Sequence, residues 1–167
     1  SAMKRNRLLF FFLLPALLLF GCAPAGQEKN PKEKIESFLS LLPSHPAGRL
    51  YESELPEDGE GHPLTRELLR ALFAREDGSL PTDGRVESMA VYLASGQDER
   101  FEAILFVCYG SADTDAVREC CLRRAQLAAS CGELRAEDAR IYISGRYVFY
   151  CLSAMPDAAE QAMRRIL

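Results

Sequence analysis

Cys22 differs from the other five cysteines of this 167-residue chain in what precedes it. The apolar block Leu8–Phe20 runs up to it, three basic residues precede the block, and small residues follow. This order is typical of a secretory signal. As a helix the block would span only about 20 Å of a hydrocarbon layer about 30 Å thick. The sequence therefore predicts an export signal rather than a permanent membrane span.

The segment Leu19-Phe20-Gly21-Cys22-Ala23 resembles the lipobox of bacterial lipoproteins. An aliphatic residue stands three positions before the cysteine, and a small residue stands directly before it. The resemblance implies that residues 1–21 are removed and that the Cys22 thiol carries a diacylglyceryl group. Two acyl chains give stable anchoring where one is marginal. The alternative is an ordinary signal peptide that happens to end near a cysteine.

Charge limits the partners of the mature chain. Residues 1–21 carry three positive charges and no acidic residue, so their removal changes the net charge from −4 to −7. No stripe of lysine or arginine with interleaved aromatic residues remains, which argues against a nucleic-acid partner. Residues 22–34 are small and polar, and we expect them to be a lipidated tether that leads into one domain, residues 35–167.

Five cysteines remain after Cys22, and their spacing favours buried side chains over metal ligands or reactive thiols. They are Cys108, Cys120, Cys121, Cys131 and Cys151. The chain has no Cys-x-x-Cys motif, and its two histidines, His45 and His62, precede all five. We therefore expect no metal site and favour buried free thiols, with disulfides as the alternative in an oxidising compartment.

Arg124 and Tyr147 are the candidate ligand-binding residues. Arg124 falls within an apolar stripe of its helix. It is expected to extend its stem over apolar surface and reach solvent, and the alternative is a buried ion pair or an anion-binding group. Tyr147 is one of several tyrosines on predicted strands, which either pack across strands or line an open sheet face for a peptide, glycan or protein. No catalytic motif is present in the mature chain, and no cofactor is expected.

The hydrophobic periodicity predicts an α+β domain. We expect a four-stranded, mainly antiparallel sheet built as ββα-ββα over residues 85–167, with both helices on one face and two short helices before it. The expected helices are 33–42, 64–76, 114–130 and one from Pro156, the strands are 88–94, 101–109, 141–143 and 146–153, and residues 43–63 are expected to form a loop.

Two regions, Glu87–Tyr109 and Ala139–Leu167, resemble a family of Gram-positive lipoproteins known as domain of unknown function four-three-five-eight. The motifs are an Arg-rich helix at Arg118–Arg124, the segment Gly145-Arg146-Tyr147-Val148 and a terminal helix led by Asp157. The resemblance implies a lipid anchor and an extracytoplasmic domain. It transfers no catalytic residue, because the family has no assigned activity.

These features predict a membrane-anchored binding or protein-interaction module in the cell envelope. Its expected location is the outer side of the cytoplasmic membrane, or the periplasmic side or outer membrane of a Gram-negative host. The alternative is an envelope hydrolase or a hydrolase inhibitor that uses carboxylates assembled by the fold. A transporter's substrate-binding protein is disfavoured, since such proteins need two lobes.

Overall fold

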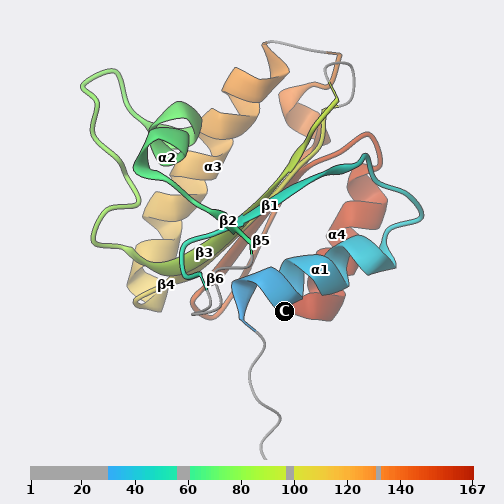
Figure 1. Ribbon diagram of the computed structural model, residues 1–167, viewed down its shortest axis with the longest axis horizontal. Coiled ribbons are helices and arrows are strands. Elements are labelled where there is room, and N and C mark those ends of the chain that lie inside the picture. Colours follow the sequence, from blue (N-terminus) through green and yellow to red (C-terminus); the bar gives the residue numbers. More distant parts are fainter. Residues whose placement is uncertain (1–29, 56–60, 97–99, 131–132) are drawn as a thin grey trace, which may run out of the picture.

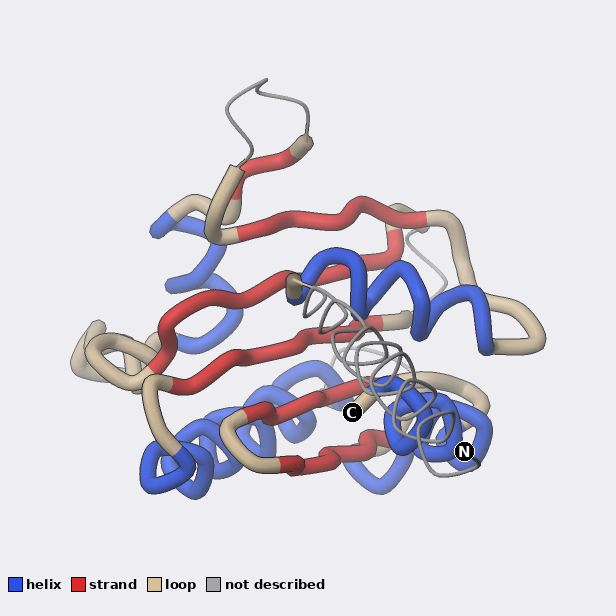
Figure 2. The backbone as a smooth tube through the Cα atoms, turned by 90° about the horizontal axis from the view of Figure 1, so that it is seen from below, coloured by secondary structure: helices blue, strands red, loops and turns tan. Residues whose placement is uncertain are grey.

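A six-stranded sheet organises the chain in the computed structural model, which describes residues 30–55, 61–96, 100–130 and 133–167. The strands lie side by side in the order β2-β1-β3-β4-β6-β5 (Figure 2). Only the β1–β2 pair is parallel, and the other neighbouring pairs are antiparallel. The strands are β1 (Gly48–Glu52), β2 (His62–Pro63), β3 (Val86–Ala94), β4 (Glu102–Cys108), β5 (Ala139–Ser144) and β6 (Tyr147–Leu152).

Two helices cover one face of the sheet, α2 (Arg66–Phe73) and α3 (Thr114–Ala129) (Figure 1). Side chains alternate between the two faces of a strand, so every second residue of β4 points towards these helices. Ile104 and Phe106 of β4 belong to this core, together with Val117 and Cys121 of α3. We call this side the α3 face.

The opposite face is covered by α1 (Pro31–Leu41) and α4 (Pro156–Ile166). Ala103 and Leu105 of β4 point to this side, where they join Phe38 of α1 and Met163 of α4 in a second core. We call this side the α4 face. Because β4 is buried along its whole length, it requires cover on both faces.

The α+β class is confirmed, but the predicted arrangement is wrong in two respects. The sheet has six strands rather than four, because the segment predicted to be a loop contains β1 and β2. The helices also lie on both faces rather than one. If the units β3-β4-α3 and β5-β6-α4 were structural repeats, a twofold axis perpendicular to the sheet would relate them, and both helices would lie on the same face. Because α3 and α4 cover opposite faces, the repeated order of strand, strand and helix is not a structural repeat.

The first helix begins earlier than predicted and belongs to the core. Asn30 accepts a hydrogen bond from the Glu33 backbone N–H at 2.9 Å, and the Glu33 carboxylate accepts one from the Asn30 N–H, which forms a capping box. The helix thus starts within the predicted tether. Ile35 and Phe38 are fully buried against the sheet, so the packed core is wider than residues 85–167.

Candidate functional site

A groove of about 460 Å³ lies between α2 and α3 on the α3 face. Leu72 and Phe73 from the end of α2 form one wall, and Leu127 from α3 lies on the other. Leu127 is 56% exposed. The remaining lining residues are Ala74, Arg75, Glu76, Cys120, Arg123, Arg124, Gln126 and Ser130.

Local structure fixes both walls of this groove. Thr65 caps α2 by accepting a hydrogen bond from the Leu68 N–H at 3.2 Å. After α2 the chain closes a turn in which the Arg75 N–H donates to the Ser79 carbonyl at 2.9 Å, and Gly78 has a positive φ of 77°. On α3, residues 120, 123, 124 and 127 share one side of the helix, because they are spaced by three or four positions.

Two arginines on this groove form no ion pair. Within the described ranges, the guanidinium groups of Arg75 and Arg123 form no ion pair and no side-chain hydrogen bond with a carboxylate. Burial raises the pKa of the Cys120 thiol, and the positive charges of Arg123 and Arg75 oppose this rise. Both arginines therefore act on the same sulfur atom, so their charges converge at the groove.

Arg124 also lines the groove, but its charge is neutralised. Its Nε donates to Glu102 Oε2 at 2.9 Å, and a terminal guanidinium nitrogen donates to Oε1, which makes a two-bonded ion pair. The two side chains are only 16% and 10% exposed. The Tyr150 hydroxyl lies 3.4 Å from Glu102 Oε2. The expected escape of Arg124 to solvent is thus wrong, and the buried ion pair is what the structure contains.

Tyr147 lies on the other side of the sheet, away from the groove. It is half-buried in the α4-face core, and the Lys34 ammonium lies 5.0 Å from its ring centroid. Helices cover both faces, so the described part of the chain has packed tyrosines rather than the alternative, an open sheet face with a tyrosine lining. The two candidate residues, Arg124 and Tyr147, are therefore not brought together.

The cysteines follow the prediction where the structure describes them. Cys108, Cys120, Cys121 and Cys151 are free and buried, whereas Cys22 and Cys131 lie outside the described residues. Burial raises the pKa of the Cys108 thiol to about 11, so it is protonated at neutral pH. No group of three or more potential metal ligands occurs among the described residues.

A second depression, of about 530 Å³, lies where several loops meet at one end of the sheet. Its polar residues include His45, Arg100, Glu133 and Ser153. The Ser153 hydroxyl accepts a hydrogen bond from the Met155 N–H at 3.0 Å, and His45 Nδ1 lies 3.4 Å from the Tyr92 hydroxyl. His45 and Ser153 thus have local partners of their own, and no nucleophile–base pair is formed between them.

Comparisons with protein-family models, curated proteins and solved structures gave no match to this chain. The resemblance to the lipoprotein family therefore stays a prediction. None of the helices in the described ranges has the length and apolar character needed to cross a bilayer. The apolar block Leu8–Phe20 lies outside those ranges.

Proposed function

We propose that this protein is a lipid-anchored binding module at the extracytoplasmic face of a membrane, and that it binds its ligand in the α2–α3 groove. The observation that carries the proposal is the groove itself. It combines the exposed side chain of Leu127 with two arginines that form no ion pair among the described residues.

The anchor is supported by the predicted export signal and by the position of Cys22 directly after it. Eight peptide steps separate Cys22 from Asn30, where the capped first helix begins, so the tether can span at most about 29 Å. A diacylglyceryl group on Cys22 would hold the domain close to the bilayer. The helix that continues from the tether, α1, covers the α4 face (Figure 1). The groove lies on the α3 face, opposite α1.

The groove supports binding rather than acid–base chemistry. A hydrolase would need carboxylates that converge on a substrate. The two buried carboxylates of the described chain instead make separate ion pairs, Glu52 with Lys32 and Glu102 with Arg124. The groove has the size of a small-molecule pocket, since such pockets usually have volumes of about 300–1,000 Å³.

Site-specific crosslinking in intact cells tests this function. A photoreactive amino acid replaces Leu127 in the groove or, as the matched control, Tyr109, which is 62% exposed outside the groove. We expect an adduct from position 127 that is absent from position 109 and that is reduced when Cys22→Ser prevents acylation. Equal adducts from both positions, or none from position 127, would contradict a binding role for the groove.

A further inference from the structure

The ligand class can be narrowed further if the proposed function holds. We propose that the α2–α3 groove binds a single-chain anionic amphiphile, a carboxylate head group on a long aliphatic chain. The head group would pair with Arg75 and Arg123, and the chain would lie on Leu72, Phe73 and Leu127.

Charge supports the head group. Arg75 and Arg123 form no ion pair in the described ranges, and the acidic residue lining the groove is Glu76. The pKa of nearby Asp77 is lowered chiefly by hydrogen bonds from Ser79 and also by the charge of Arg75. Arg124 adds no net charge because Glu102 neutralises it. Guanidinium groups bind carboxylates through parallel hydrogen bonds, and hydrogen bonds to charged groups are stronger than neutral ones.

Apolar surface supports the chain. Leu72 and Phe73 are packed into the core and are only 5% and 3% exposed, whereas the Leu127 side chain is largely exposed to solvent. An aliphatic chain laid along this wall would remove Leu127 from water, which is favourable in proportion to the apolar area covered.

A flexible chain fits better than a peptide helix. A helix with its side chains is about 10–12 Å wide. The groove lies between two helices that contact each other, and its whole volume is only about 460 Å³. An acidic peptide helix could reach the arginines only by resting above the groove, and it would leave the space beside Leu72 and Phe73 unfilled.

Photolabelling of the full chain in its native membrane tests the proposal. Cells receive a long-chain fatty acid that carries a diazirine near the end of the chain, or the corresponding fatty alcohol. After illumination the protein is purified, and the labelled residues are mapped by mass spectrometry. We expect the acid to label the peptides that contain Phe73 or Leu127, and unlabelled fatty acid to compete.

Two double variants distinguish recognition of the carboxylate charge from nonspecific hydrophobic binding. Arg75→Gln with Arg123→Gln should reduce labelling by the acid about tenfold or more, since two charge-assisted hydrogen bonds are lost. Labelling by the alcohol should be weak and unchanged. The matched control is Arg49→Gln with Arg165→Gln, two exposed arginines outside the groove that also form no ion pair in the described ranges. This control should leave the labelling as it is.

Three results would overturn the inference: equal labelling by acid and alcohol, labelling that the Arg75 and Arg123 substitutions do not change, or label outside the groove only. Capture of a protein from position 127 together with no fatty-acid label would also reject the amphiphile. That last result would leave the binding function standing, whereas the absence of both signals would reject both proposals.

Discussion

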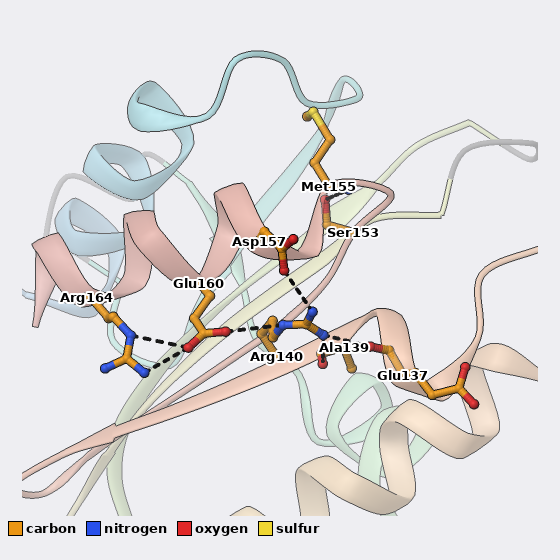
Figure 3. Close-up of polar contacts among 8 residues, drawn as sticks. All are labelled: Glu137, Ala139, Arg140, Ser153, Met155, Asp157, Glu160 and Arg164. Atoms are coloured by element: carbon orange, nitrogen blue, oxygen red, sulfur yellow. Dashed lines mark hydrogen bonds and ion pairs between the residues drawn. The ribbon is translucent and has the colours of Figure 1, made fainter.

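The ion pairs on the two faces of the sheet differ in burial and in the number of residues that they join. On the α4 face, Arg140 of β5 contacts Asp157 at 3.1 Å and Glu160 at 3.3 Å, and Arg164 shares Glu160 at 2.8 Å (Figure 3). Arg140 also donates to the carbonyls of Glu137 and Ala139. On the α3 face, Arg124 and Glu102 form one buried pair.

This comparison shows where charge is left available. The two arginines of the α4-face cluster, Arg140 and Arg164, have carboxylate partners, and the cluster clamps β5 to α4. On the α3 face, Arg124 pairs with buried Glu102, and Arg66 and Arg118 of the covering helices have exposed ion pairs of their own. At the groove, Arg75 and Arg123 form no ion pair in the described ranges. Arg140 and Arg164 therefore hold β5 and α4 together, whereas Arg75 and Arg123 leave positive charge beside the groove on the α3 face.

The largest effect is expected from breaking the buried pair of the α3 face. Glu102→Ala should lower the free energy of unfolding by about 3–5 kcal/mol, because it leaves the Arg124 charge buried without its partner. The double variant Glu102→Leu with Arg124→Leu should recover most of this loss. Urea unfolding measures both, and a Glu102→Ala loss under about 1 kcal/mol would mean that the pair is solvated like a surface pair.

A smaller effect is expected from the thiol chemistry of the same face. Burial raises the pKa of Cys108 from 9.0 to about 11, so the folded state favours the neutral thiol. Stability from this group is complete below pH 9 and falls as the pH rises from 9 to 11, by no more than about 1.4 kcal/mol per pH unit. Cys108→Ala should flatten the decline in unfolding midpoint over that range. An identical slope in both proteins would contradict the assignment.

Breaking the α4-face cluster should cost less than breaking the buried pair. Arg140→Ala is expected to lower the free energy of unfolding by about 1 kcal/mol, because its partners stay solvated and Glu160 keeps Arg164. High salt should weaken this effect. Chemical unfolding at low and high salt checks it, and a loss equal to that of Glu102→Ala would remove the distinction between the two faces.

The smallest effect on stability is expected from the groove arginines. Arg75→Gln with Arg123→Gln should change the free energy of unfolding by no more than about 0.5 kcal/mol, since neither side chain has an ion pair to lose. Thermal unfolding of the pair variant measures this. A marked loss of stability would show that the arginines hold the fold together rather than serve a ligand.

Much of the fold follows from local patterns. The spacing of Ile35, Phe38 and Leu39 predicts α1, and the unbroken apolar run of β4 predicts a strand buried on both faces. The apolar run of β4 already argues against a sheet with helices on one face only. The strand β1 was missed because its five residues contain little apolar pattern and lie between prolines.

The groove could not be predicted in the same way. Its walls come from α2 and α3, which are separated by about 40 residues of chain, and no local pattern shows that they meet. Arg123 follows the ordinary pattern of an exposed helix residue, and Arg75 follows the end of a helix. The partner of Arg124 did leave a signal, since Glu102 is an acidic residue within an otherwise apolar strand.

The location of the protein depends on the chemistry of Cys22. The most direct measurement is mass spectrometry of the amino-terminal peptide of the protein isolated from its native membrane. We predict that this peptide begins at Cys22 and carries the mass of a diacylglyceryl group. An unmodified Cys22 that is still joined to residues 1–21 would contradict the account.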